Sequence, residues 1–312
     1  MVSDNKQPLA LFLMGPTASG KTALALEIAK RLNVEIISVD SAMVYRGMDI
    51  GTSKPSVLER GSVPHHLIDI CDPLESYSAA RFVKDAVQCM QDITKRGAIP
   101  LLVGGTMLYF QALQRGLSEL PPANPLIREA ILKKAALMGW PFLHQRLSMI
   151  DPKSAARIHL NDAQRIQRAL EVYEISKRPL SDFLGKRDSS IENYCLHAFA
   201  LMPLDRKILH DVIAKRFDQM LADGLVGELE KLYKRGDLTP ILPSMRSVGY
   251  RQVWEYLEGE CTWDEMRLKA IIATRQLAKR QITWLRSWPH IKWLQNTHSA
   301  SLETVIDCVS SA

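Results

Sequence analysis

Cysteine is scarce in this sequence, and long apolar runs are missing from it. Its five cysteines show no C-x-x-C spacing and no nearby histidine pair, so the usual zinc-site patterns and a disulfide framework are excluded. The apolar run of residues 9–14 is far too short for a signal core or a membrane span. We therefore expect a cytoplasmic protein from a reducing compartment, with no membrane segment.

Charge of one sign is also not in large excess. Lys and Arg number 40 against 34 Asp and Glu, and the formal net charge of +6 is only a mild bias toward polyanionic partners. Apolar residues make up 46% and charged residues 24% of the 312 residues, which excludes collagen-like, coiled-coil and disordered classes. On charge alone, a basic soluble enzyme is the simplest interpretation. The length of the chain predicts two lobes.

Three short apolar runs predict buried parallel strands. They cover residues 9–14, 34–39 and 99–103, and each ends at a glycine or an aspartate. Helical patterns over residues 21–32 and 78–96 lie between them, and this alternation favours a doubly wound sheet. Ligands of such sheets bind at the carboxyl ends of the strands, so the three strand ends form one candidate site.

The pattern changes at a proline-rich breaker cluster, residues 120–125, which ends a helix begun near Thr106. Helical periodicity with little strand signal follows, and residues 194–201 predict a return to the sheet before further helices from Asp205 to Trp288. The predicted fold is α/β: a P-loop NTPase-like parallel sheet flanked by helices, with an inserted all-helical lobe. We expect the core to comprise residues 1–120 and 194–312, and the lobe residues 121–193.

The strongest motif is G-x-x-x-x-G-K-[ST], directly after the first predicted strand and directly before a helix. Backbone N–H groups, the helix dipole and the Lys21 ammonium can bind phosphate oxygens there, while Thr22 offers its hydroxyl to Mg²⁺. The motif does not distinguish a nucleotide from another diphosphate ester. Its residues are Gly15, Pro16, Thr17, Ala18, Ser19, Gly20, Lys21 and Thr22.

The acidic residue that a P-loop ATPase uses to hold Mg²⁺ is missing, because the strand of residues 99–103 ends in Gly104, Gly105 and Thr106. Asp40 closes a neighbouring strand, where P-loop kinases of small molecules hold their acceptor. A substrate-facing base and a turn cap before Ser41 are equally supported by this spacing.

Several stretches together resemble the tRNA dimethylallyltransferases, also called tRNA isopentenylpyrophosphate transferases. The similarity spans nearly the whole chain, through residues 15–22, 38–55, 64–67, 103–109, 164–168, 216–220, 246–251 and 274–281. The bacterial form is indicated, because the Cys and His pairs of a eukaryotic zinc-finger extension are absent. The resemblance implies transfer of a dimethylallyl group from its diphosphate to N6 of the adenosine immediately 3′ of the tRNA anticodon, without consumption of ATP.

The resemblance also implies roles for individual residues. The loop of residues 15–22 holds the diphosphate with Mg²⁺ as cofactor at Thr22, Asp40 is the general base, and Thr106 and Arg216 support the reacting phosphate. A monomer is expected, since an asymmetric tRNA does not require symmetry. The anticodon stem-loop is expected to contact Asp40, Ser41, Ala42, Met43, Thr106, Arg128, Gln164, Arg165, Ile166, Gln167, Arg168, Arg246, Ser247, Val248, Gly249, Tyr250 and Arg251.

Simpler structural interpretations remain for some of these residues. Without the resemblance, an amphipathic helix with Arg168 paired to Glu171 is favoured, and residues 246–251 fit a helix start. The adjacent His65 and His66 fit a loop or the core better than a metal site, and Trp284 with Trp288 is expected in the core.

Two other functions are compatible with the phosphate loop. One is an ATP-dependent kinase of a nucleoside or small metabolite, with Asp40 as the base for a hydroxyl group. The other is a nucleotide-gated RNA-binding module without chemistry. Transfer of an isoprenoid to tRNA distinguishes the dimethylallyltransferase hypothesis from these two.

Overall fold

The computed structural model describes residues 7–184, 189–203, 205–294 and 298–311. The chain divides into two compact units, a core unit formed by Met1–Gln114 with Ser190–Ala312, and a second unit formed by Arg115–Ser189. The sequence had placed the corresponding boundaries at residues 121 and 193. None of the helices in the described ranges combines the length and the apolarity that a bilayer crossing requires.

The core unit is built on one sheet of six parallel strands, and the expected α/β class is confirmed. The strand order is β3-β2-β4-β1-β5-β6, so the strands that carry the phosphate loop and the candidate base lie near its middle. The strands are β1 (Leu9–Met14), β2 (Val34–Val39), β3 (His65–His66), β4 (Ile99–Gly104), β5 (Cys195–Leu201) and β6 (Lys292–Leu294).

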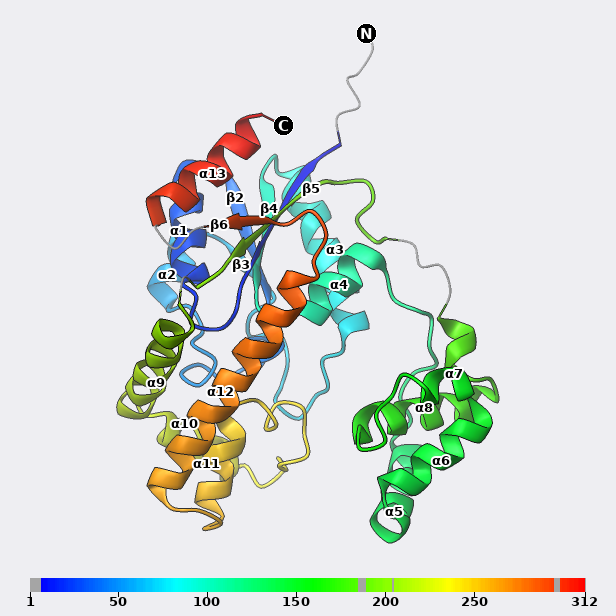
Figure 1. Cartoon of the computed structure of the whole chain (residues 1–312). Coiled ribbons are helices and arrows are strands. Elements are labelled where there is room, and N and C mark those ends of the chain that lie inside the picture. The colour runs from blue at the N-terminus through cyan, green and yellow to red at the C-terminus, as the bar shows by residue number, and fades with distance from the viewer. Residues whose placement is uncertain (1–6, 185–188, 204, 295–297, 312) are drawn as a thin grey trace. The chain divides into compact units, whose positions relative to one another are not determined.

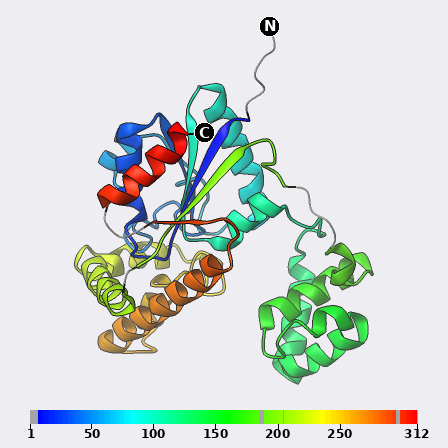
Figure 2. The same cartoon turned by 45° about the horizontal axis from the view of Figure 1, so that its top comes forward.

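Helices cover both faces of this sheet, as Figures 1 and 2 show for α1 and α13 on one face and α3 and α4 on the other. Alternate side chains of β1 point to opposite faces of the sheet. Leu11 and Leu13 pack in one hydrophobic cluster, and Phe12 and Met14 pack in the other. The helices are α1 (Lys21–Arg31), α2 (Val57–Ser62), α3 (Ala79–Lys95), α4 (Met107–Arg115), α9 (Arg206–Ala222), α10 (Leu225–Tyr233), α11 (Tyr250–Leu257), α12 (Trp263–Arg286) and α13 (His298–Ser310).

Local signals define the ends of several helices. Ser78 caps α3 by accepting from the Arg81 N–H, and Thr262 forms a capping box with Glu265 at the start of α12. The predicted end of the fourth helix was wrong, because α4 stops before Gly116, whose φ of 74° leaves the helical region. The prolines of the breaker cluster therefore lie in an irregular segment that follows the helix.

Among the described residues of the second unit, the regular elements are all helical: α5 (Pro125–Met138), α6 (Trp140–Ile150), α7 (Pro152–Ala155), α8 (Ala163–Ser176) and the 3₁₀ helix η1 (Leu180–Phe183). Its small core gathers Ile131, Leu143, Leu147, Ile166 and Leu170. Ile166 has no exposed surface, so its expected contact with tRNA is wrong. The side chain stabilises the unit instead.

A buried carboxylate organises the polar side of α8. Glu171 is fully buried and accepts from Arg128 Nε and Arg168 Nη1, each at 2.8 Å. Burial alone disfavours the charge, yet the hydrogen bonds from both arginines hold the pKa of Glu171 below its usual value. The simpler interpretation of Arg168 is confirmed, since both arginines neutralise an internal charge.

Candidate active site at the carboxyl ends of the strands

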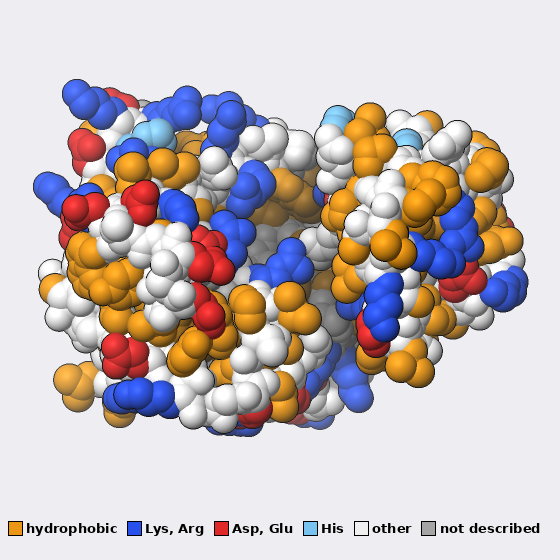
Figure 3. All heavy atoms as spheres, turned by 90° about the horizontal axis from the view of Figure 1, so that it is seen from below, with side chains coloured by type: hydrophobic (Ala, Val, Ile, Leu, Met, Phe, Trp, Pro, Cys, Tyr) orange, Lys and Arg blue, Asp and Glu red, His pale blue; other side chains and the backbone are white. Residues whose placement is uncertain are grey.

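The structure brings the three predicted strand ends together around one cavity of about 1160 Å³ within the core unit. The phosphate loop, Asp40 and Thr106 line it from the sheet, and residues of α9 and α12 line it from the other side. Figure 3 shows a hollow on this side of the core unit with Lys and Arg side chains around it. An anionic ligand is the class that such a surface favours.

The phosphate loop depends on glycine at defined positions. Gly20 has a φ of 85°, and Ala18, two residues before it, is also left-handed with a φ of 62°. A Cβ on Gly15 would lie 2.7 Å from Ser19 Oγ and 3.0 Å from the Leu201 carbonyl oxygen of β5. The loop is therefore held close against its own residues and the neighbouring strand.

Two cations converge on the cavity without full neutralisation. Burial, and then the positive charge of Arg216, lower the pKa of Lys21 to about 7, while Asp40 opposes the shift. Burial also lowers the pKa of Arg216. Lys21 Nζ donates to the Pro16 carbonyl oxygen at 2.6 Å, and Arg216 Nε to Ser53 Oγ at 2.9 Å. A bound phosphate would supply the negative charge that this pair lacks.

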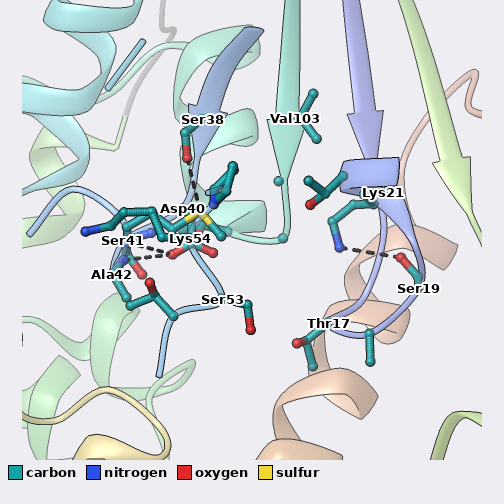
Figure 4. A pocket seen from close by; sticks show the side chains of 18 of the residues that line it. Thr17, Ser19, Lys21, Ser38, Asp40, Ser41, Ala42, Ser53, Lys54 and Val103 are labelled. Atoms are coloured by element: carbon teal, nitrogen blue, oxygen red, sulfur yellow. Dashed lines mark hydrogen bonds between the residues drawn. The ribbon is translucent and has the colours of Figure 1, made fainter. Parts of the chain in front are cut away.

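Asp40 lies across the same space from Lys21 and Ser19, as Figure 4 shows. Its Oδ1 accepts from the Ala42 N–H at 2.8 Å and from the Met43 N–H at 3.2 Å, so the turn-cap interpretation is correct. Among the described residues, the second oxygen, Oδ2, has no hydrogen-bond donor. One carboxylate can thus hold the turn and present a free oxygen to a ligand.

Thr106 and Ser41 connect the ends of β4 and β2. Thr106 Oγ1 accepts from the Ser41 N–H at 3.1 Å, and the Thr106 N–H donates to the Val39 carbonyl oxygen. Gly104 allows this approach, because a Cβ there would lie 2.1 Å from the Val39 carbonyl oxygen. Thr106 therefore positions the segment that carries Asp40.

Gln281 of α12 is a site residue that the sequence analysis missed. Its Oε1 accepts from the Thr17 N–H of the phosphate loop at 2.9 Å, and its Nε2 donates to the Gly105 carbonyl oxygen at 2.8 Å. The residue is buried and sits between Ala278 and Leu285 on the apolar face of the helix. A polar residue within such a face is the signal that could have revealed it.

Residues 246–251 only partly match the expectation of a tRNA contact. Arg246 is exposed at the cavity, but Tyr250 is fully buried and donates its hydroxyl to Glu228 Oε1, so it cannot stack on a base. Gly249, with a φ of 93°, starts α11, and the helix-start interpretation is confirmed. Arg251 is exposed on α11 beside Glu255.

The remaining aromatic and histidine predictions have mixed outcomes. Trp288 is buried as expected, whereas Trp284 packs against the core and also lines the cavity. His65 and His66 form the edge strand β3 rather than a loop, and His66 Nε2 lies 2.7 Å from Glu35 Oε2. Across the described residues, no group of three or more potential protein ligands could hold a metal ion.

Binding of inorganic diphosphate at about pH 8 is expected to take up protons. Free Lys21, with a pKa of about 7, is mostly neutral there and regains its proton against the anion, whereas at about pH 6 it is already charged and the uptake disappears. Calorimetry in two buffers of different ionisation enthalpy measures the number of protons taken up on binding. Lys21→Met gives the baseline for ionisation of the ligand itself. Equal proton uptake by the wild-type protein and by Lys21→Met would show that Lys21 is not the group that takes up the proton.

Gln281→Glu is expected to weaken diphosphate binding by about tenfold, because the carboxylate cannot donate to Gly105 and adds negative charge beside the loop. The same titration with Gln276→Glu is the matched control, since Gln276 is exposed on the same helix and carries the same change of charge. Equal affinities of the two variants for diphosphate would show that the hydrogen bonds from Gln281 to Thr17 and Gly105 do not shape the phosphate loop.

Comparison with protein families gives a match over most of the chain. The model of a family described as IPP transferase matches residues 43–288. A tRNA dimethylallyltransferase of Thioalkalivibrio sulfidiphilus is 60% identical over 288 residues, which cover 92% of this chain and 90% of that protein.

Solved structures of similar proteins share the fold. The full-length tRNA isopentenylpyrophosphate transferase of Bacillus halodurans is 37% identical, with a TM-score of 0.71 over 98% of this chain and 96% of that one. A eukaryotic dimethylallyltransferase acting on tRNA is 25% identical, with a TM-score of 0.81 over 97% of this chain and 80% of that one. On this likeness of sequence and structure, the chain belongs to the IPP transferase family.

Proposed function

We propose that this chain transfers the dimethylallyl group of dimethylallyl diphosphate to N6 of the adenosine immediately 3′ of the anticodon in tRNA, with release of diphosphate. The observation that carries the proposal is that Asp40 and the phosphate loop line opposite sides of one cavity. The relative at 60% identity, a tRNA dimethylallyltransferase, supports the choice of both substrates.

The phosphate loop and Arg216 are proposed to bind the leaving group. As the allylic C–O bond breaks, negative charge grows on the bridging oxygen of the diphosphate. Lys21, Arg216 and the loop N–H groups can stabilise that charge more strongly than the charge of the intact donor. Their convergence before any ligand binds keeps the cost of reorganisation low during the reaction.

Asp40 is proposed to be the general base. The adenine amine is a weak nucleophile because its lone pair is delocalised into the ring, so a carboxylate must orient it and accept a proton as the C–N bond forms. Oδ1 is engaged by the turn, which leaves Oδ2 for this task. Thr106 holds the neighbouring Ser41 backbone and keeps the carboxylate in place.

Magnesium fits the donor set only as an ion shared with the substrate. Mg²⁺ commonly takes one or two protein oxygens together with phosphate oxygens and water, and the Thr22 hydroxyl lies at the start of α1 beside the loop. Thr22 and the diphosphate would hold it, and it would supply charge neutralisation on the leaving group.

The tRNA is proposed to contact the exposed cations of both units. In the core unit, Arg246 and Arg280 are exposed at the cavity, where a base turned out of the anticodon loop would enter. In the second unit, Gln164 and Arg165 are exposed on α8. We also propose that the chain acts as a monomer on cytoplasmic tRNA.

Mass analysis of unmodified tRNA tests the reaction directly. Incubated with the protein, Mg²⁺ and dimethylallyl diphosphate, the tRNA should gain one dimethylallyl group at the adenosine following the anticodon. Incubation with ATP should leave the tRNA unchanged. Phosphoryl transfer from ATP to a nucleoside, without prenylation of tRNA, would instead support the kinase hypothesis.

Asp40→Asn is expected to lower kcat by about 10² to 10⁴, because the amide keeps an acceptor for the Ala42 and Met43 N–H groups but cannot take the proton. Affinity for tRNA should change by less than about threefold, since the turn is preserved. Single-turnover kinetics and a filter-binding assay measure the two quantities. Full activity of the variant would remove Asp40 from the chemistry.

Arg165→Ala is expected to weaken tRNA binding and to reduce the slope of log K against log salt by about one, because the side chain is 72% exposed. Lys133→Ala is the control, since Lys133 is equally exposed on α5 and also pairs with an acid. Arg168→Ala should differ from both by destabilising the second unit by about 1–3 kcal/mol, as Glu171 loses a partner. Equal slopes for Arg165→Ala and the wild-type protein would contradict the contact.

A further inference from the structure

A second cluster of reactive side chains lies near the start of β5, whereas the phosphate site lies at the carboxyl ends of the strands. Lys292 Nζ donates to Cys308 Sγ at 2.9 Å, and His197 Nδ1 lies 3.0 Å from the same sulfur. The other nitrogen of this ring, Nε2, lies 3.8 Å from Cys195 Sγ. Three elements, β5, β6 and α13, supply these groups.

Two nitrogen atoms contact the Cys308 sulfur, one from Lys292 and one from His197. Burial, and then the charge of Lys292, lower the pKa of His197, so its ring is neutral at pH 7 and carries one N–H. With that hydrogen on Nδ1, the Cys308 sulfur accepts from both His197 and Lys292, and Nε2 is free to accept from the Cys195 thiol. Cationic and N–H donors of this kind stabilise thiolates, the form that reacts with peroxides.

The cluster is open to small molecules. Its four side chains line a cavity of about 530 Å³ together with Thr304, Asp307 and Ser311. Burial raises the thiol pKa of three other cysteines: Cys71, Cys261 and Cys89, the last to about 11. Cys308 is buried, with 8% of its surface exposed, but the cavity that it lines gives a small molecule access to the sulfur beside the Lys292 nitrogen. Cys261 offers an internal control.

We propose that Cys308 is a peroxide-reactive cysteine whose oxidised form is captured by Lys292 as a sulfenamide. In the first step the thiolate attacks hydrogen peroxide, an S–O bond forms and the O–O bond breaks. Sulfur loses two electrons, and the released hydroxide takes a proton from the Lys292 ammonium to give water. In the second step the Lys292 amine attacks sulfur, an N–S bond replaces the S–O bond, and the departing hydroxide leaves as water with a proton from nitrogen.

Capture by Lys292 is favoured over a disulfide by the arrangement of the groups. The His197 ring contacts Cys308 on one nitrogen and Cys195 on the other, so it separates the two sulfur atoms. The Lys292 nitrogen already contacts the Cys308 sulfur. The product would be a reversible covalent link between β6 and α13, outside the cavity of the transfer reaction.

Peroxide treatment of the full-length protein followed by peptide mass spectrometry tests the proposal. The expected product is a cross-linked pair of peptides joining Lys292 to Cys308, lighter by two hydrogen atoms and separated again by a thiol reductant. A dimedone trap in the same reaction reports sulfenic acid at each cysteine. Cys308 should react about tenfold faster than Cys261.

Two substitutions separate the charge of Lys292 from its nucleophilic role. Lys292→Arg keeps the cation, so fast oxidation of Cys308 should persist while the link is lost and dimedone labelling rises. Lys292→Met removes the cation as well, and oxidation of Cys308 should slow toward the rate of Cys261. The proposal is overturned if Cys308 in the native protein reacts no faster than Cys261, or if its sulfenic acid accumulates without a link to Lys292.

Discussion

The arrangement of the core unit depends on keeping two cations close together without full neutralisation. Lys21 and Arg216 come from α1 and α9, far apart in the sequence, and their mutual repulsion helps to lower the pKa of Lys21. Such a pair costs free energy in the empty protein, and binding of a phosphate recovers that cost. The surrounding framework of β1, β5 and the phosphate loop must therefore be rigid enough to hold them.

Rigidity comes from backbone contacts that are shared between elements. Gly15 lies against the carbonyl of Leu201, Thr106 accepts from the Ser41 backbone, and Gln281 joins the phosphate loop to Gly105. Each contact links one strand end to another element around the cavity. These contacts hold the ends of β1, β2 and β4 in fixed positions relative to one another, and Gln281 fixes α12 to them.

The middle of the sheet and the phosphate loop could be predicted from the sequence, because continuous apolar runs and a glycine-rich motif depend on local chemistry. The edge strands β3 and β6 could not, since two or three residues are too few for a periodic signal and pair only where the sheet provides a neighbour. Gln281 acts through hydrogen bonds to two distant backbones, which no spacing reveals.

Errors among the expected tRNA contacts have a common physical cause. The resemblance implied a tRNA contact for every residue of a short motif, although successive side chains of a helix point to different faces. Ile166 consequently lies in the core beside exposed Arg165, and buried Tyr250 precedes exposed Arg251. The pairing of Arg168 with Glu171 could be predicted because the two residues lie three apart on one helix, whereas Arg128 pairs with the same carboxylate from 43 residues away.

The pairing of β1 with β5 has a consequence for biosynthesis. Leu9 pairs with Cys195 and Met14 with Ala200, so the first strand of the chain is bordered on one side by a strand that leaves the ribosome only after the entire insertion. Until then β1 presents an unpaired edge, a template for aggregation. Fast independent folding of the second unit would shorten the time during which β1 lacks β5 as a neighbour. Slow folding of the insertion would first lower the yield of folded enzyme.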